Sequence, residues 1–552
     1  MKLAKTVQTR RRFLGTASAA SLGAAFIACG GGGDDASPIG DPSVTGSQAP
    51  RTPKSGGIIH VPTNTEPPNL DGTTQYTVSI HSNMAQVYNR VVRWNWGPGI
   101  LPTSTEIAPE LGASWEQPDD TTIVFHLQPN VRFQNVAPVN GRAFSSADIK
   151  ATFGRILDPA LHSQLAGKWT GYLESVDTPD PSTATFKLSK PYAEFFNALA
   201  FHYSWIVPEE LAAGDALKTQ MIGTGPFMLN EYKKGDRITF KKNPDYWEPG
   251  KPYVDGLERI LITDPGAMIS SFSAGQLDLT DPNAGALDPD TIASLKSKVS
   301  GSRSEEDYPW ATRRLQVTAT KPPLNDPRVR LAILKLIDQK QIIDVAYQNG
   351  AFVGPLPWMF GDFGLPEAEA KKLMTVSVSE AKKLLDAAAY DYDQTLEISI
   401  TPQYGAQYKS TAELVQQQLQ KAGIKTKIES YQYAEYLARW KPPFDKNQLA
   451  VAPLTGNSPD LMFTAYNPKG DYYFAPVTDE KLIAMTEKQR TLIKPEERAA
   501  FTQDIQRYLL QENVVDIPLG LPRTDGIVGP SLQEFYYTNT FGLPSLRDAW
   551  LA

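Results

Sequence analysis

The stretch LEISITPQYGAQYKSTAELVQQQLQKAGIKTKIES, from Leu396 to Ser430, decides the fold class. Leu396–Ile400 alternates apolar and polar side chains, as a strand does, and Lys425–Ser430 is predicted to be the second strand. Between them, Ser410–Ala422 has the composition of a helix and is followed by Gly423, a residue that favours helix ends. A strand, a helix and a strand in this order predict a β-α-β unit, in which a helical crossover joins two parallel strands.

Strand and helix patterns continue on both sides of this unit. Because nearly 500 residues exceed the roughly 300 that one core supports, we predict α/β material in at least two lobes. Helix starts are predicted where Ser145 pairs with Asp148, where Ser377 pairs with Glu380, and at Asp326-Pro327. The other predicted elements are strands at 57–62, 121–128, 182–189 and 514–519 and helices at 79–92, 147–157 and from Pro495 onward.

The first 28 residues have the layout of an export signal. They contain five basic residues and no acidic one, followed by a short run rich in Ala, Ser and Gly. Arg10 and Arg11, in the sequence TRRRFL, are typical of a twin-arginine motif. The run is shorter and less apolar than the roughly 20 residues that span a membrane comfortably. An amphipathic or buried N-terminal helix is the alternative reading, but the segment has no polar stripe.

Cys29, the single cysteine of the 552 residues, follows this signal directly. The sequence FIAC resembles a bacterial lipobox, with Phe26 in place of the usual leucine, so we predict that Cys29 is lipidated. A free thiol near a disordered end is the alternative. The following residues up to Ser55 contain no aromatic side chain and are predicted to be a flexible tether.

Charge and residue types exclude several functions. Removal of the signal takes away five basic residues and no acidic ones, which changes the net charge from −7 to −12. Because of this negative net charge, the chain has no general affinity for nucleic acid or anionic lipid. No phosphate loop, dinucleotide motif or HExxH motif occurs, and no histidines are spaced as metal ligands along a helix. We therefore expect no cofactor and no metal site, whereas hydrolase chemistry stays an unsupported alternative.

A series of phrases in fixed order gives a resemblance to a known family. The phrases include GGIIHVPTNTEPPNLDGTTQY (56–76), GTGPFMLNEYKKGDRITFKKNPDYWEPGKPYVDGL (223–257), PPLNDPRVRLAILKLID (322–338) and AELVQQQLQKAGIKTKI (412–428). Together the phrases resemble the family 5 extracellular solute-binding proteins, the peptide- and nickel-type receptors of bacterial ABC importers, over residues 56 to about 550.

The resemblance implies a two-lobe periplasmic-binding-protein (Venus flytrap) fold that closes on a ligand by a hinge. It also implies an extra domain inserted in the N-terminal lobe, and chain crossings between lobes near 308–310 and 519–523. The implied division is an export signal at 1–28, a lipidated tether at 29–55, lobe I at 56–87, 223–309 and 523–552, its inserted domain at 88–222, and lobe II at 310–522.

One position departs from the peptide-binding members of that family. In those proteins an aspartate neutralises the α-ammonium group of the peptide. Aligned on Pro459-Asp460, the corresponding residue here is Asn457, an amide without charge. The resemblance therefore puts unmodified peptides in doubt, unless Asp460 supplies the charge instead. A simple polar turn at 457–460 is the alternative.

Aromatic residues beside strand ends complete the predicted site. Tyr76 follows the first strand, Trp310 lies at a proposed crossing, Trp358 lies in the loop GPLPWMF, and Tyr404 follows the first strand of the β-α-β unit. Aromatic rings at strand ends can stack on sugars or apolar ligands, although each of them is also a common packing residue. With Asn457 and Asp460, these form the predicted ligand-binding set.

The predicted function is a lipid-anchored solute receptor on the extracytoplasmic face of a bacterial membrane, in the periplasm or at the cell surface. Its partners are expected to be a small solute or peptide, ABC permease and ATPase subunits, and the membrane through the lipid on Cys29. We expect a monomer that binds no nucleic acid. The alternatives are a cell-envelope hydrolase on an α/β scaffold and a receptor that presents its ligand to a membrane sensor.

Overall fold

The predicted β-α-β unit is confirmed in the computed structural model of the chain. It consists of β14 (Thr395–Ile400), α11 (Ala406–Gln420) and β15 (Lys425–Ser430), and β14 and β15 are parallel neighbours. The helix begins at Ala406 rather than at Ser410, because Gly405 turns the chain with a φ of +90°. Gly423, with a φ of +88°, follows the helix end as expected.

The structure describes most of the chain after the tether. The described residues are 52–97, 100, 104–201, 203–281, 287–307, 311–348, 350–352, 354, 358–440, 446, 448–456, 458–468, 470, 477–522, 524–538 and 543–552. The chain divides into two units between Pro50 and Arg51. The predictions on Arg10, Arg11 and Cys29 therefore lie outside the described residues. Within the described ranges, no helix combines the length and apolar character needed to cross a membrane.

The β-α-β unit is part of a six-stranded mixed sheet with the order β13-β17-β12-β16-β14-β15. β16 runs parallel to β14, whereas β12 is antiparallel to both β16 and β17. We call the part of the molecule built on this sheet the second lobe. The remaining strands are β12 (Ala311–Val317), β13 (Ala351–Phe352), β16 (Leu449–Thr455) and β17 (Asp516–Pro522).

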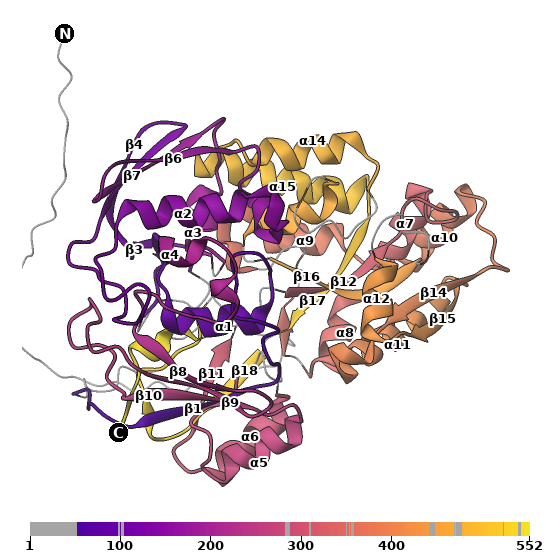
Figure 1. The fold of residues 1–552 in the computed structure, drawn as a ribbon. Coiled ribbons are helices and arrows are strands. Elements are labelled where there is room, and N and C mark those ends of the chain that lie inside the picture. Colours follow the sequence, from indigo (N-terminus) through magenta and orange to yellow (C-terminus); the bar gives the residue numbers. More distant parts are fainter. Residues whose placement is uncertain are drawn as a thin grey trace, which may run out of the picture. The chain divides into compact units, whose positions relative to one another are not determined.

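Helices cover both faces of this sheet, so β17 is buried along its whole length, whereas the edge strand β15 has no buried residue. Leu315 and Val451 pack into one apolar cluster with α7, α8, α10 and α11, which gather beside β14 and β15 in Figure 1. Leu454 packs on the other face with helices that include α13 and α15. The bounds are α7 (Pro327–Leu334), α8 (Gln339–Ala346), α10 (Val378–Ala387), α12 (Tyr433–Arg439), α13 (Pro459–Phe463), α14 (Glu480–Gln489) and α15 (Pro495–Gln511).

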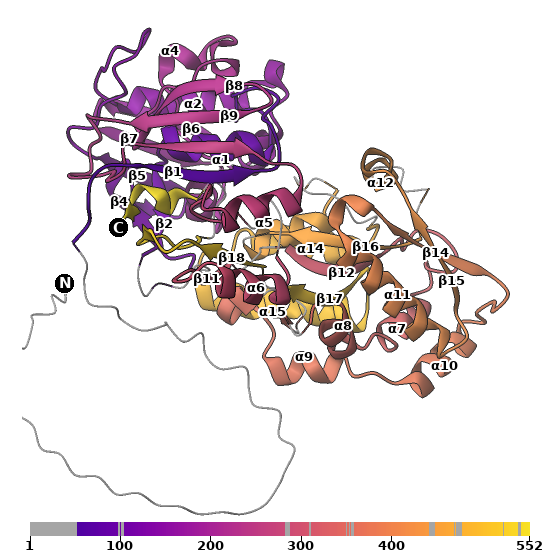
Figure 2. The ribbon, with the colours of Figure 1, turned by 90° about the horizontal axis from the view of Figure 1, so that it is seen from below.

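Two four-stranded sheets form the first lobe. One has the order β1-β10-β9-β8, in which the N-terminal strand lies parallel to a strand about 200 residues later, and Figure 2 shows these strands side by side. The other has the order β4-β5-β7-β6. A single apolar cluster joins side chains from both sheets. The strands are β1 (Ile58–Thr63), β4 (Gly112–Asp119), β5 (Thr122–Leu127), β6 (Leu173–Asp180), β7 (Thr183–Leu188), β8 (Phe227–Lys233), β9 (Arg237–Lys242) and β10 (Gly256–Leu261).

Three predicted helix starts are confirmed. Ser145 and Asp148 form a full capping box before α2 (Ser146–Leu157). The Ser377 hydroxyl accepts the Glu380 N–H at 3.2 Å, and the Asp326 carboxylate accepts the Arg328 N–H at 2.9 Å before Pro327. These short-range patterns were visible in the sequence because capping needs only neighbouring residues.

The predicted helix at 79–92 is too long. The helix α1 covers Val78–Val87, and the chain then turns into the strand β2 (Val92–Trp94). The helix ends at Val87 because the segment GTGPF (223–227) contacts it there. The Gly225 N–H donates to the Val87 carbonyl at 2.8 Å. A Cβ on Gly223 would lie 2.1 Å from the same oxygen, so only glycine permits this approach. A tertiary contact therefore ends the helix where the apolar pattern alone continues.

Two neighbouring connections lead from the first lobe into the six-stranded sheet. β11 (Arg303–Asp307) pairs with β18 (Thr524–Val528), and the next strands, β12 and β17, pair within the six-stranded sheet. The predicted crossing at 308–310 lies between β11 and β12 in the sequence, whereas the one at 519–523 overlaps the end of β17 and extends to the residue before β18. Residues 308–310 and 523 themselves are outside the described ranges, and the division into domains stays a prediction.

The other elements are short. They are β3 (Ile107–Pro109), α3 (Phe195–Ala200), α4 (Glu209–Ala212), α5 (Pro265–Ser273), α6 (Pro289–Lys298), α9 (Glu367–Leu373), β19 (Leu532–Gln533) and β20 (Trp550–Leu551), with 3-10 turns at Pro159–Leu161, Gln164–Lys168, Ala216–Lys218, Trp358–Phe363, Pro402–Tyr404, Thr464–Tyr466 and Pro544–Arg547.

Candidate functional site

One edge of the six-stranded sheet carries Tyr404, one of the predicted site residues. β14, β15 and β16 run in the same direction, so the loops after them leave from the same edge. β12 starts at this edge, since Ala311 lies opposite Thr455. In open α/β sheets, ligands bind beyond the carboxyl ends of parallel strands. The topology thus places Tyr404 at this edge. Trp310 and Asn457 lie outside the described residues, so their place stays a prediction.

Tyr404 is the centre of an aromatic group at this edge. Its ring lies 4.8 Å from Tyr408 and 5.7 Å from both Tyr433 and Tyr436. Tyr404 is half-buried, and burial raises its pKa above the ordinary tyrosine value. Tyr433 leaves 40% of its surface exposed, and the Arg313 guanidinium lies 4.6 Å from the Tyr408 ring. The group therefore offers an aromatic surface with a cation beside it.

Tyr76 lies in the first lobe, between β1 and α1. Its backbone N–H donates to Gln164 Oε1 at 2.9 Å, and its ring lies 4.7 Å from Tyr203. Tyr203 also meets the His81 ring edge-on at 4.4 Å. Tyr76 is partly buried against the first-lobe core, so part of its role is packing.

Trp358 begins a 3-10 turn, Trp358–Phe363, whose last residues lie against α15. Gln503 and Gln506 donate their side-chain N–H groups to the carbonyls of Asp362 and Phe363 at 2.8 and 2.7 Å. The turn is therefore fixed to a helix of the second lobe. The Trp358 side chain lies outside the described part of the structure, so its role in binding stays a prediction.

Asp460 is buried and fully engaged by the protein itself. Arg490 donates to both of its oxygens, at 2.8 and 3.0 Å, and Gln489 Nε2 donates at 2.5 Å. Burial alone would raise the pKa of the Asp460 carboxyl, but the charge and hydrogen bonds of these neighbours together lower that pKa. A carboxylate with this many donors has little capacity left to neutralise a ligand ammonium group.

The residues around Asp460 also reach the first lobe. Arg498 contacts Gln489 and forms an ion pair with Glu194, which lies between β7 and α3. The backbone N–H of Ala193 donates to the Arg490 carbonyl at 2.7 Å. Sequence reasoning missed Glu194, Arg490 and Arg498. No local pattern could have paired Glu194 with Arg498, because the two residues are 304 positions apart.

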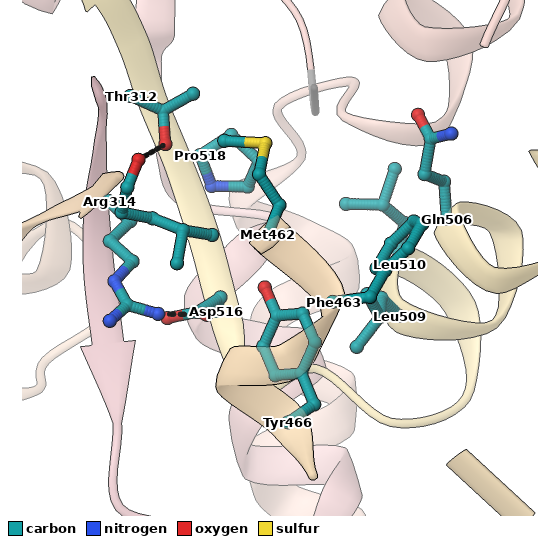
Figure 3. Close-up of a pocket in the computed structure, with 11 residues that line it drawn as sticks. Thr312, Arg314, Met462, Phe463, Tyr466, Gln506, Leu509, Leu510, Asp516 and Pro518 are labelled. Carbon is teal, nitrogen blue, oxygen red and sulfur yellow. Dashed lines mark hydrogen bonds and ion pairs between the residues drawn. The ribbon is translucent and has the colours of Figure 1, made fainter. Parts of the chain in front are cut away.

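A small cavity lies beneath the sheet, beside a second buried ion pair (Figure 3). Arg314 Nη1 donates to Asp516 Oδ2 at 2.5 Å, and Thr312, Met462 and Tyr466 also line the cavity. Its volume is about 30 Å³, which is room for about two water molecules. The cavity is therefore too small for a peptide or a comparable solute, and it is not the ligand site.

The described residues do not assemble a metal centre: no group of three or more His, Cys, Asp or Glu side chains among them is placed to hold an ion. The potential ligand-contacting groups in this part of the chain are aromatic rings, amides and arginines. This arrangement suits recognition of a solute by stacking and hydrogen bonding.

Comparisons with known proteins agree with this picture. Residues 106–473 match the family model of the bacterial extracellular solute-binding proteins, family 5 (Middle). Di/tripeptide-binding protein 1 of Pseudomonas aeruginosa (strain UCBPP-PA14) is 28% identical over 403 residues, which cover 66% of this chain and 70% of that protein. Heme-binding protein A of Haemophilus influenzae is 29% identical over 391 residues, which cover 66% of this chain and 68% of that protein.

A solved structure shares the fold. The ABC transporter-associated periplasmic binding protein DppA from Helicobacter pylori, in complex with the peptide STSA, gives a TM-score of 0.75 at 21% identity. The match covers 90% of this chain and 98% of that chain. It confirms the predicted mixed α/β periplasmic-binding-protein fold with two lobes and an extra domain.

The family match extends over well more than half of the chain. Its members are binding proteins without enzymatic activity, so the alternative of an envelope hydrolase is wrong. The chain belongs to the bacterial extracellular solute-binding proteins of family 5.

Proposed function

We propose that the chain is the receptor of an ABC importer, which captures a solute between its two lobes, closes by a hinge and delivers the solute to a permease. The observation that carries this proposal is that the loops after β14, β15 and β16 leave the second lobe from one edge of its sheet. The strand pair β11 and β18 precedes this lobe, and the strand pair β12 and β17 belongs to it. A few residues at the ends of such elements can absorb the φ/ψ changes of a hinge.

The proposed ligand is a small solute without a free α-ammonium anchor, such as a blocked peptide or a non-peptide solute. Asn457 stands where the resemblance to peptide binders implies an aspartate. Asp460, the other acidic candidate of this loop, is engaged by Arg490 and Gln489. The names of the two relatives given above refer to peptides and to heme at nearly equal identity, so overall similarity does not select the ligand class.

The proposed contacts come from both lobes. Tyr76 would contribute from the first lobe, and Trp310, Trp358, Tyr404 and position 457 from the second. We keep the division into lobe I (56–87, 223–309, 523–552), its inserted domain (88–222) and lobe II (310–522) as part of the proposal. The bounds of lobe II are supported by the six-stranded sheet, because all of its strands lie between residues 311 and 522.

Ligand binding is tested by its effect on the stability of the protein against unfolding. Mass spectrometry of solutes that co-purify with the protein identifies a candidate ligand. At 100 times its dissociation constant, that solute should raise the free energy of unfolding by about 2.7 kcal/mol. It should be recovered chemically unchanged after incubation with stoichiometric protein. Recovery of a converted product would contradict the proposal.

The proposed anchor is a lipid on Cys29, after export through the twin-arginine route. Cys29→Ser should move the protein out of the membrane fraction, and retention of this variant after a high-salt wash would exclude lipid anchoring. Arg10→Lys together with Arg11→Lys should leave the precursor in the cytoplasm. Normal export of the double variant would indicate the general secretory route instead.

The proposed partners are the permease and ATPase subunits of an importer. Cross-linking of the ligand-loaded protein in cell envelopes, followed by mass spectrometry of the linked partner, should recover a permease. Recovery of a membrane sensor alone would favour the alternative in which the receptor presents its ligand to a sensor.

A further inference from the structure

The contacts around Glu194, Asp460, Gln489, Arg490 and Arg498 join the two lobes, and we call them the cross-lobe network. We propose that this network holds the closed arrangement and links it to the loop at 456–460, so that Arg490 and Arg498 are positioning residues for ligand capture. The proposal rests on the proposed hinge closure and adds the residues that stabilise it.

The first-lobe side of the network is the 190–194 segment, which leads from β7 into α3. The Ala193 N–H donates to the Arg490 carbonyl at 2.7 Å, and its own carbonyl accepts from Arg498 Nη1 at 3.5 Å. Glu194 forms the ion pair with Arg498 Nη2. Tyr172 and Tyr192 place their rings 5.3 and 5.9 Å from the Arg490 guanidinium. This segment therefore contacts the second lobe through both its backbone and its side chains.

The second-lobe side leads directly to the loop after β16. Arg498 donates to Gln489 Oε1 at 2.8 Å, and Gln489 donates to Asp460 at 2.5 Å. Arg490 holds both oxygens of Asp460. Asp460 lies in the first turn of α13, three positions after Asn457. A displacement of the 190–194 segment would therefore be transmitted to Asp460 and the first turn of α13.

The burial of the ion pair between Glu194 and Arg498 makes it specific to the closed form. The Glu194 and Arg498 side chains are only 4% and 5% exposed. When the lobes separate, both charges can return to water, but if one partner is removed, the other remains buried without compensation in the closed form. Loss of Arg498 should therefore disfavour the closed form specifically.

The chain offers a matched control pair that lies within one lobe. Arg155 and Asp71 are both 2% exposed and 2.7 Å apart, and both belong to the first lobe. Their pair is as buried as that of Arg498 and Glu194 but does not cross to the second lobe. Replacement of Arg155 should destabilise the fold and leave the cross-lobe contact unchanged.

The test is hydrogen exchange at the Ala193 amide, whose acceptor lies in the other lobe. In Arg498→Met, protection of this amide should fall at least about tenfold, the effect of the loss of a buried charge partner. The Leu188 amide, which bonds Thr121 within the first lobe at 2.8 Å, should keep its protection. Arg498→Lys should restore part of the Ala193 protection, and Arg155→Met should not lower it selectively.

The proposal is overturned if Ala193 protection is unchanged in Arg498→Met, or if it falls together with that of Leu188. If Arg498→Met does not fold, Glu194→Gln replaces it in the same comparison, since this variant preserves side-chain shape. Labels at Lys150→Cys and Lys383→Cys, both exposed, in a Cys29→Ser background then report the separation of α2 and α10. A co-purified solute that binds without changing this separation would contradict hinge closure itself, whatever the Ala193 result.

Discussion

Two buried arginine–aspartate pairs in the second lobe differ in how completely the carboxylate is satisfied. Asp460 receives two hydrogen bonds from Arg490 and one from Gln489. Asp516 meets Arg314 through one nitrogen, and Arg314 Nε has no hydrogen-bond partner within the described structure. Burial favours the neutral form of both carboxyl groups, and the neighbouring donors favour the charged form, so that the pKa of Asp460 is lowered and that of Asp516 is raised.

The pairs also differ in location. Arg314 and Asp516 lie on neighbouring strands, β12 and β17, inside one lobe. Asp460 and Arg490 lie where the second lobe meets the 190–194 segment of the first lobe. We infer that the first pair serves the fold and that the second serves the arrangement of the two lobes. In both pairs the aspartate interacts with an arginine of the same protein.

The largest effect is expected for Asp460→Asn. This change leaves Arg490 buried without its carboxylate, which typically costs about 3–5 kcal/mol. Urea unfolding at neutral pH should show a loss of this size. Addition of Arg490→Met should recover part of the loss, because no unpaired charge then remains. A single variant as stable as the wild type would show that the pair contributes nothing.

The next largest effect concerns ligand choice and comes from Asn457→Asp. This variant adds a carboxylate at position 457, so a peptide with a free α-ammonium group should gain about 2 kcal/mol or more in binding free energy. Calorimetry with the free and N-acetylated forms of one tripeptide measures this gain. An equal change for both forms would indicate that position 457 does not face the ligand terminus.

A smaller effect is expected for Asp516→Asn. Because Asp516 has fewer donors, replacement by a neutral amide should cost about 1–3 kcal/mol in the free energy of unfolding, less than Asp460→Asn under the same conditions. The same urea series compares the two variants directly. A loss equal to or greater than that of Asp460→Asn would break the distinction between the two pairs.

The pH dependence of these losses should have opposite signs. Burial raises the pKa of Asp516 despite Arg314, whereas the pKa of Asp460 is lowered. The stabilisation from Asp460 is present above the unfolded value of about 3.9 and is lost as the pH falls through its lower folded pKa. The contribution of Asp516 is present below that value and is lost as the pH rises through its higher folded pKa.

Unfolding experiments between about pH 3 and pH 7 test these signs. The destabilisation caused by Asp460→Asn should shrink toward pH 3, and that caused by Asp516→Asn should shrink toward pH 7. Parallel curves for the two variants would contradict the assigned directions of the two pKa shifts.

Much of the fold was predictable because its signals are local. The β-α-β unit followed from alternation and from Gly423, and the caps at Ser145 and Asp326 needed only neighbouring residues. The end of α1 could not be predicted, because it depends on the approach of Gly223 and Gly225 to the Val87 carbonyl. Such contacts between distant segments leave no periodic pattern in the chain.

The candidate site was predictable in part. The position of Tyr404 after a parallel strand followed from strand order, which fixes the edge from which loops leave. The engagement of Asp460 could not be predicted, because Arg490 is 30 residues away and pairs with it only through the packing of α13 against α14. The question of whether Asp460 could serve a ligand therefore required the structure.

The most direct test of the central claim, that the carboxylate of this loop is used by the protein and not by a ligand, is calorimetry on the unmodified protein. The titrants are the free and N-acetylated forms of one di- or tripeptide, chosen for measurable binding of the acetylated form. We predict that the two dissociation constants differ by less than about tenfold, because no buried charge pair distinguishes them. A free peptide that binds tenfold or more tightly than its acetylated form would contradict the account and would assign the ammonium site to Asp460 or another carboxylate.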